Sequence, residues 1–423
     1  MKITVHSSKV VKPAAYAGVD AAAAATTTTV IPLTAFDLIS YDNYVSSIHA
    51  FHPPSPTNAA LEEALARVLA VYREWAGRLC VADGRRGILL NDAGVRFVEA
   101  SSDAAFESAV MPRRGRITPE VRSLHPRAAS GGGAAAAEED EELLLLQVTR
   151  FACGSLVVGY TMHHAVGDGF AAGQFMAAWG QTARGVPIDP VPVHDRTSFF
   201  LPRTPPRVEF DHRASEFRQR DDVDNNDNHH AAELKDDEVV IQQVRFSREF
   251  ISELRSRASG NGTTQHHHHH RPYSTAQCLV AHIWRCMTKA RGVDGGRATT
   301  LHLAVNGRPR MSGPRVPEGY TGNLEEGLVP AAAAEPEAAV LCPDVAVYCL
   351  LRAPFYDIDL GGGGRQFFYT PGYYPDEGVV YILPPSPLGD GSVEVHVSLF
   401  SRAMDVFKGC CYELGQLEEI ILQ

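Results

Sequence analysis

The stretch from Gln147 to Gly169, QVTRFACGSLVVGYTMHHAVGDG, decides the fold class and holds the densest chemical signal of the chain. Its apolar run at 155–160 has the length of a strand, and a similar run at 143–148 lies on the other side of a turn at 152–154. The later strand leads directly into two histidines and a loop with two glycines. We therefore expect an imidazole at the edge of a sheet, where it can face a cleft.

The two histidines, His163 and His164, and Asp168 form the candidate catalytic group. An imidazole with a pKa near 6.5 can accept a proton at neutral pH, so it suits a general base. Asp168 lies four residues after His164 and could orient the ring, although five-residue patterns of this kind also recur by chance. Neighbouring residues on a strand point to opposite faces, so we predict no metal site at the two histidines.

Helix and strand patterns alternate on both sides of this stretch. Residues 61–69 have apolar side chains at helical spacing, residues 239–246 have the pattern of a strand, and residues 393–399 alternate as a half-buried strand should. This mixture predicts an α/β protein. A segment rich in proline and charge marks the natural boundary, so we expect a first domain at 1–200, a linker at 201–238 and a second domain at 239–423.

The amino-acid composition argues against several classes of protein. The 423 residues include 39 Lys and Arg against 50 Asp and Glu, and this excess of acid argues against nucleic-acid binding. No apolar run reaches the roughly 18 residues of a membrane span, and the eight cysteines include no CxxC pair. We therefore expect a reduced protein in the cytoplasm without a membrane partner. Polar tracts at 128–142, 221–238 and 259–270 are expected to be loops, and the five histidines at 266–270 are interpreted as a repeat rather than a metal site.

Several blocks along the chain occur in the order of one known family. They include MKITVHSSKVVKP at 1–13, the histidine stretch up to Gly185, YSTAQCLVAHIW at 273–284, AVNGRP at 304–309 and DLGGG at 359–363. Together they resemble the plant BAHD acyl-CoA-dependent acyltransferases over nearly the full length. The amino-acid sequences of these blocks are most similar to those of the grass amine N-hydroxycinnamoyltransferases that act on agmatine, tryptamine or tyramine.

This resemblance implies a fold and a reaction. The fold is that of two similar α/β domains, as in chloramphenicol acetyltransferase, with a tunnel between them. His164 matches the catalytic histidine of the family, which takes a proton from the acceptor while the acceptor attacks the thioester directly in a ternary complex. The acyl-CoA, of hydroxycinnamoyl type, is a co-substrate, and no further cofactor is implied. The expected protein is a monomer with an amine acceptor; an alcohol acceptor or a catalytically impaired family member are the alternatives.

The resemblance also assigns structural residues. Asp168 corresponds to an aspartate that points away from the tunnel and pairs with an arginine of the second domain, which here is Arg308. Asp359 and Gly361 belong to the late motif of the family, which is also structural. A hydrolase is a weaker interpretation, because the chain has no Ser or Cys nucleophile in a GxSxG context.

Four further residues are candidates for substrate binding. Arg271 and Lys289 are basic groups near the block at 273–284 that could bind the CoA phosphates. Glu377 is a candidate carboxylate for a cationic acceptor. Leu350 stands where relatives place a tryptophan on the acceptor side, so an indole N–H donor is lost there.

The chain departs from the family in two places. Leu360 and Gly362 replace Phe and Trp of the late motif. After Asn323, relatives continue into a strand and a long helical stretch, whereas here Asn323 runs directly into Leu324, so several dozen residues are expected to be absent. Because that segment contributes to the core of the second domain, its loss is expected to lower stability and activity.

Overall fold

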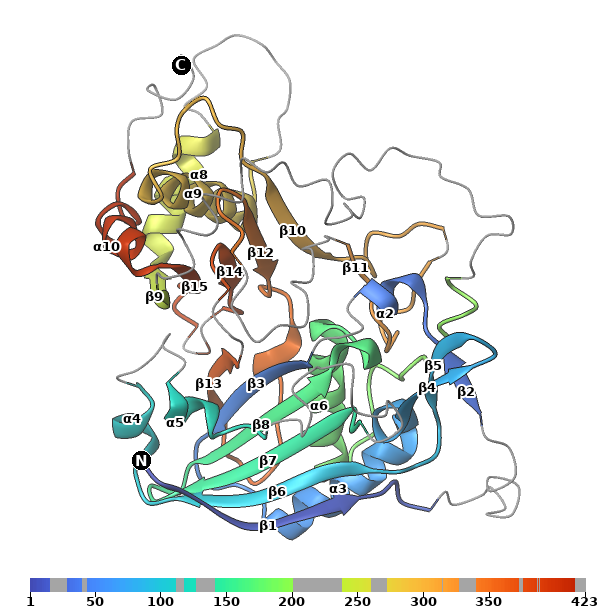
Figure 1. Cartoon of the computed structure of the whole chain (residues 1–423). Coiled ribbons are helices and arrows are strands. Elements are labelled where there is room, and N and C mark those ends of the chain that lie inside the picture. The colour runs from blue at the N-terminus through green and yellow to red at the C-terminus, as the bar shows by residue number, and fades with distance from the viewer. Residues whose placement is uncertain are drawn as a thin grey trace.

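The computed structural model describes residues 1–15, 29–39, 44–111, 118–126, 141–200, 238–259, 272–313, 315–326, 340–372, 376–385, 387 and 389–414. Within these ranges the chain forms two six-stranded sheets and one three-stranded sheet. Figure 1 shows the two large sheets one above the other, each with helices packed along it.

The first large sheet carries the histidine stretch. Its strands follow the order β1 (Ile3–Val11), β6 (Val95–Ser102), β7 (Leu144–Phe151), β8 (Leu156–His163), β3 (Tyr44–Phe51) and β13 (Gln366–Pro371). All neighbours are antiparallel except β6 and β7. Every residue of β8 is buried, because this central strand is covered on both faces.

Two helices cover the first sheet and close its core. They are α3 (Asn58–Val71) and α6 (Gly169–Ala183). The indole N–H of Trp179 on α6 donates to the carbonyl oxygen of Leu61 on α3 at 2.9 Å, so the two helices are joined where both are buried. This packing holds α6 against α3, and α6 begins five residues after the second histidine.

The second large sheet lies in the later half of the chain. Its order is β11 (Glu325–Glu326), β10 (Leu301–Asn306), β12 (Val345–Cys349), β14 (Val379–Ile382), β15 (Val393–Phe400) and β9 (Val239–Phe246). Strands β10, β12 and β14 run parallel, and the other pairs are antiparallel. A second core joins this sheet to the helices α8 (Arg248–Ser259), α9 (Thr275–Ala290) and α10 (Ser401–Cys410).

Smaller elements complete the described part. The three-stranded sheet consists of β2 (Val30–Pro32), β5 (Arg85–Leu89) and β4 (Arg78–Ala82). The short helices are α2 (Ala35–Ile39), α4 (Phe106–Ala109) and α5 (Pro119–Arg122), and single 3-10 turns lie at η1 (Arg73–Ala76), η4 (His164–Val166) and η6 (Pro354–Tyr356).

One strand of the later half belongs to the first sheet. β13 pairs with β3 from Gln366 opposite Phe51 to Pro371 opposite Ser47. The expected second domain at 239–423 is therefore not contiguous, because this strand completes the first sheet before the chain returns to β14. The expected linker lies almost wholly outside the described residues, so its role as a boundary stays a prediction.

The patterns at 61–69, 239–246 and 393–399 are confirmed as parts of α3, β9 and β15. The tract at 128–142 and the histidines at 266–270 lie mostly or wholly outside the described residues. Across the described ranges, every helix is too short or too polar to cross a membrane.

Candidate active site

The histidine stretch forms a tight connection between β8 and α6, which we call the His loop (residues 163–168). His163 ends β8, and the turn η4 contains His164. Asp168 is the N-cap of α6, and its Oδ1 accepts a hydrogen bond from the backbone N–H of Ala171 at 2.8 Å. The loop is therefore fixed at both ends by regular structure.

The two histidines have different environments. His163 is buried, its Nδ1 accepts from the backbone N–H of Ala165 at 3.2 Å, and its ring packs edge-on against Tyr44 at 4.8 Å. Burial lowers the pKa of His163 to about 3, so this ring is neutral and structural. His164 is partly exposed, which makes it the histidine that a substrate can reach.

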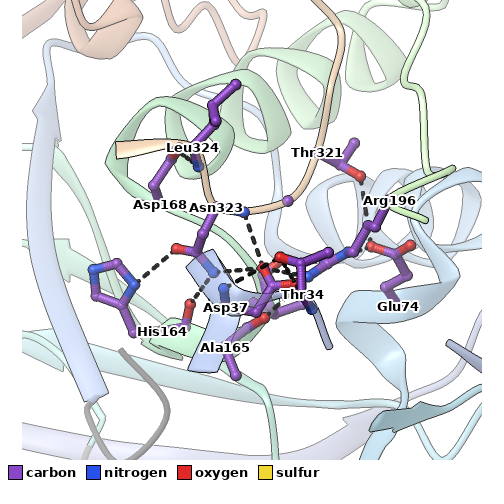
Figure 2. Close-up of polar contacts among 12 residues, drawn as sticks. Thr34, Asp37, Glu74, His164, Ala165, Asp168, Arg196, Thr321, Asn323 and Leu324 are labelled. Atoms are coloured by element: carbon purple, nitrogen blue, oxygen red, sulfur yellow. Dashed lines mark hydrogen bonds and ion pairs between the residues drawn. The ribbon is translucent and has the colours of Figure 1, made fainter. Parts of the chain in front are cut away.

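A hydrogen bond to Asn323 determines which nitrogen of His164 carries the proton. Nδ1 of His164 lies 3.0 Å from Oδ1 of Asn323. The amide nitrogen of Asn323 donates to the carbonyl oxygen of His164 at 2.8 Å and to Oδ1 of Asp37 at 3.0 Å. Since the amide oxygen can only accept, Nδ1 carries the hydrogen and Nε2 keeps its lone pair. Figure 2 shows Asn323 between the ring and Asp37.

The pKa of His164 is held below its ordinary value. Burial opposes the charged imidazolium. The charge of Asp168, the hydrogen bonds of the ring with its own backbone and with Asn323, and the charge of Asp37 offset this effect only in part. The ring is therefore neutral at physiological pH, with Nε2 available to accept a proton.

Asp168 faces the second half of the chain. Nη1 of Arg308 lies 2.9 Å from Oδ2 of Asp168, and Nη2 lies 3.2 Å from Oδ1. The backbone N–H of Leu324 also donates to Oδ2, at 2.8 Å. Burial disfavours the carboxylate, but Arg308 and the N–H donors outweigh it, so the pKa of Asp168 is lowered. Both side chains are buried, and the ring of His164 is oriented by Asn323 rather than by this carboxylate.

A second buried arginine holds the other side of the His loop. Nη1 of Arg196 donates to Oδ1 of Asp37 at 2.9 Å and to the carbonyl oxygen of Ala165 at 3.1 Å. Nη2 donates to Oε2 of Glu74 at 2.8 Å and to the carbonyl oxygen of Val166 at 2.6 Å. The guanidinium therefore binds two carboxylates and the main chain of the two residues that follow His164. Figure 2 shows Arg196 with Asp37, Glu74 and Ala165.

Sequence reasoning missed Asn323, Arg196 and Glu74 as functional residues, and gave Asp37 no role. The contacts of each residue depend on a partner that is distant in the chain; His164 and Asn323, for example, are 159 positions apart. Only the polarity of these four residues was visible in the sequence, and polar residues are usually exposed.

The other predicted structural residues lie away from His164. Asp359 is half exposed and forms an ion pair of 3.1 Å with Arg184 at the end of α6. Its Oδ1 accepts from the backbone N–H of Gly361 at 2.9 Å. Gly361 has φ of +87°, which is a conformation that favours glycine.

The predicted substrate-binding residues are dispersed. Leu350 is partly buried against a cluster that contains Phe355, Tyr369 and Leu383. Lys289 is mostly exposed on α9, with its Nζ 3.8 Å from a carboxylate oxygen of Glu413. Arg271 lies outside the described residues.

Glu377 has an internal partner, which argues against its expected contact with a cationic acceptor. Its two oxygens accept from Nε and Nη2 of Arg291 at 2.8 and 2.9 Å, and Oε2 also accepts from the backbone N–H of Cys342 at 3.0 Å. The carboxylate is fully buried. Burial nevertheless raises the pKa of Glu377 against the effect of Arg291. The carboxylate is thus bound by groups of the chain itself, and its expected contact with an acceptor stays a prediction.

The junction of Asn323 and Leu324, where the family resemblance implies absent residues, is part of the site. The N–H of Leu324 binds Asp168, and its carbonyl oxygen accepts from the N–H of Gly307 at 2.8 Å. The side chain of Leu324 is buried, and the chain continues directly into β11. Both residues of this junction are therefore bonded to the His loop, and the absence of a family segment after Asn323 stays a prediction.

Known proteins resemble this chain over almost all of its length. Agmatine hydroxycinnamoyltransferase 1 of Oryza sativa subsp. japonica is 48% identical over 471 residues, covering 99% of this chain and 100% of the relative. Agmatine coumaroyltransferase-1 of Hordeum vulgare is 48% identical over 465 residues, covering 98% of this chain and 100% of the relative. Both alignments exceed the 423 residues of this chain, so they contain positions for which the chain has no residue.

A solved structure and a family profile also match this chain. The crystal structure of vinorine synthase matches with a TM-score of 0.70 at 21% identity, covering 96% of each chain. This likeness supports the two-domain fold expected from the sequence. The Transferase family profile matches residues 1–345. The chain therefore belongs to the Transferase family, the BAHD acyltransferases whose motifs it carries.

Proposed function

We propose that this chain transfers a hydroxycinnamoyl group from its CoA thioester to an amine of the agmatine type. The observation that carries the proposal is His164, a partly exposed imidazole whose Nδ1–H is bound by Asn323 and whose Nε2 is a free base. The names of the two agmatine enzymes support the choice of donor and acceptor.

The proposed reaction needs one base and no covalent enzyme intermediate. The amine nitrogen attacks the thioester carbonyl carbon while Nε2 of His164 takes a proton from the nitrogen. The tetrahedral oxyanion then collapses, the C–S bond breaks, and the imidazolium returns the proton to the departing CoA thiolate. The products are an amide and free CoA. Because both substrates must be aligned at once, the proposal places their reacting ends in a tunnel between the two sheets.

The remaining assignments concern binding and setting. We propose that Arg271 and Lys289 contribute to binding of the CoA phosphates, and that Leu350 lies on the acceptor side. The enzyme is proposed to act as a monomer in the cytoplasm, with residues 201–238 as the connection between its two units.

The test is release of CoA by the full chain. p-Coumaroyl-CoA is mixed with agmatine, tryptamine, tyramine or shikimate, and free thiol is measured over time. We expect turnover with agmatine, and a loss of about 10²- to 10⁴-fold for His164→Ala, because a general base contributes that much. His6→Ala is the matched control, since His6 is exposed on the edge strand β1.

Three other results would redirect the proposal. Preference for shikimate would favour the O-acyltransferase alternative. A folded chain that turns over none of the four acceptors would favour an impaired family member. Full activity of His164→Ala would remove His164 as the base and with it the mechanism.

A further inference from the structure

We propose that Asn323 is a positioning residue that sets the tautomer of His164, and that Asp37 and Arg196 hold Asn323 in place. The proposal rests on the proposed function in one respect, which is that Nε2 of His164 is the base. It adds that a residue of the later half of the chain decides which ring nitrogen can act.

The amide of Asn323 is oriented by two acceptors. Its Nδ2 donates to the carbonyl oxygen of His164 and to Oδ1 of Asp37. A rotation of the amide by 180° would place Oδ1 against both of these oxygens and lose both hydrogen bonds. Asn323 is buried, so water cannot replace them easily. The amide oxygen is therefore directed at Nδ1 of His164.

Asp37 is the anchor of this arrangement. Its Oδ2 accepts from the N–H and the hydroxyl of Thr34, each at 2.8 Å. Its Oδ1 accepts from Arg196 and from both the backbone N–H and the side chain of Asn323. Five donors surround this fully buried carboxylate, so Asp37 has little freedom to shift. It binds Asn323 through both the main chain and the side chain of that residue.

Arg196 connects this anchor to the loop that carries the base. The same guanidinium that pairs with Asp37 also binds the carbonyl oxygens of Ala165 and Val166. The ion pair of Arg196 and Asp37 therefore binds both the main chain after His164 and the side-chain amide of Asn323. Its charge-assisted hydrogen bonds oppose a displacement of the His loop relative to Asn323.

The chemical consequence concerns the direction of the lone pair. With Asn323 present, the hydrogen occupies Nδ1 and Nε2 is basic. Without it, the Nε2–H form becomes accessible, and the lone pair then lies on Nδ1, on the side from which Asn323 was removed. That tautomer cannot accept a proton at Nε2, so removal of Asn323 lowers the rate even when both substrates bind.

The direct test is the protonation pattern of the His164 ring. Full-length protein with ¹⁵N-labelled histidine is examined by NMR, and the signals of His164 are identified by their loss in His164→Ala. We expect a protonated Nδ1 and an unprotonated Nε2 in the unaltered chain, and a shift of population toward Nε2–H in Asn323→Ala. A merely structural role of Asn323 would leave the tautomer unchanged.

Kinetics and a matched control complete the test. We expect Asn323→Ala to lower kcat by at least about 10-fold, within the roughly 10²–10⁴-fold limit of a lost general base, with a smaller change in KM. Asn58→Ala is the control, because Asn58 on α3 also loses side-chain hydrogen bonds, to Glu99 at 2.8 Å and from Arg150 at 3.0 Å, away from the His loop. It is expected to keep both kcat and the tautomer.

The outcomes separate the two proposals. If the His164 ring of the unaltered chain is protonated at Nε2, the proposed role of Asn323 is wrong, whether or not any variant folds. The role is also wrong if Asn323→Ala leaves both the tautomer and kcat unchanged. If the unaltered chain has no transferase activity but shows the expected tautomer and its loss in Asn323→Ala, the proposed function fails while the positioning role stands.

Discussion

At the scale of single residues, the proposed base His164 and the amide of Asn323 lie 159 positions apart in the chain and meet at 3.0 Å. The HxxxD pattern leads to His164 because an imidazole after a buried strand is chemically conspicuous. The link from Asn323 to the ring depends on a contact across 159 positions of the chain, and nothing in the local pattern encodes it. Asp168 and Arg308 lie in an ion pair as the family resemblance implies, but that resemblance, rather than the spacing, supplied the pairing.

The pH dependence follows from the direction of the His164 pKa. The base form exists above the pKa. Burial moves this pKa below its ordinary value, against the opposing effects of Asp168, the backbone of His164, Asn323 and Asp37. The acid limb of kcat/KM is therefore expected below the usual value for histidine. An alkyl amine, which is protonated at neutral pH, should add a second rise toward alkaline pH. Profiles of kcat/KM against pH, measured with agmatine and with shikimate, separate the titration of His164 from that of the acceptor amine. An acid limb above pH 6.5 with both acceptors would contradict the lowered pKa of His164.

Asp168→Asn tests the ion pair of the His loop. The substitution removes the charge opposite Arg308 and leaves a buried guanidinium without its carboxylate, which costs about 3–5 kcal/mol of unfolding free energy. Asp168 also accepts from the N–H groups of Ala171 and Leu324, so the loop and activity should suffer together. Denaturant unfolding and CoA release measure the two effects. Loss of turnover with unchanged stability would instead indicate a direct catalytic role for Asp168.

At the scale of elements, strand and helix patterns were readable but their pairing was not. The sequence of β8, buried along its whole length, and the periodicity of α3 are local properties. β13 also has a local strand pattern, yet its assignment to the first sheet depends on β3, more than 300 residues earlier in the chain. This explains why the division into domains was drawn as contiguous in sequence.

Gly180 tests the packing of α6 against the segment that leads to β13. A Cβ at this position would meet the carbonyl group of Asp359, with its carbon at 2.9 Å. Gly180→Ala is therefore expected to cost about 1–3 kcal/mol of unfolding free energy through overpacking, although alanine favours a helix. Gly409→Ala in α10 is the matched control, because a Cβ there meets open space, and it should gain up to about 1 kcal/mol. Equal effects in thermal unfolding would contradict close packing at Gly180.

At the scale of the whole molecule, the two large sheets are covered to different degrees. Strands β7 and β8 of the first sheet are buried almost throughout. β10 of the second sheet is only partly covered, and Leu303 on it exposes 37% of its surface. β10 lies next to the short edge strand β11, and apolar surface that stays exposed there adds nothing to the core. The expectation that this chain lacks a segment of its relatives stays a prediction. The hydrogen bonds of Leu324 with Asp168 and Gly307 depend on pairings of distant residues and become visible only in three dimensions.

Insertion variants test this asymmetry. The positions of Agmatine hydroxycinnamoyltransferase 1 for which this chain has no residue, inserted together after Glu326, are expected to cover β10 and to raise the thermal unfolding midpoint. The expected gain is about 25 cal/mol of unfolding free energy for each Å² of apolar surface removed from water. The same segment between Asn323 and Leu324 would separate the N–H that binds Asp168 from the amide that binds His164, so it should lower both stability and CoA release. Unfolding and turnover of the two variants, compared in parallel, decide the question. The proposal fails if the second insertion is tolerated, because the His loop would then not depend on the continuity of residues 323 and 324.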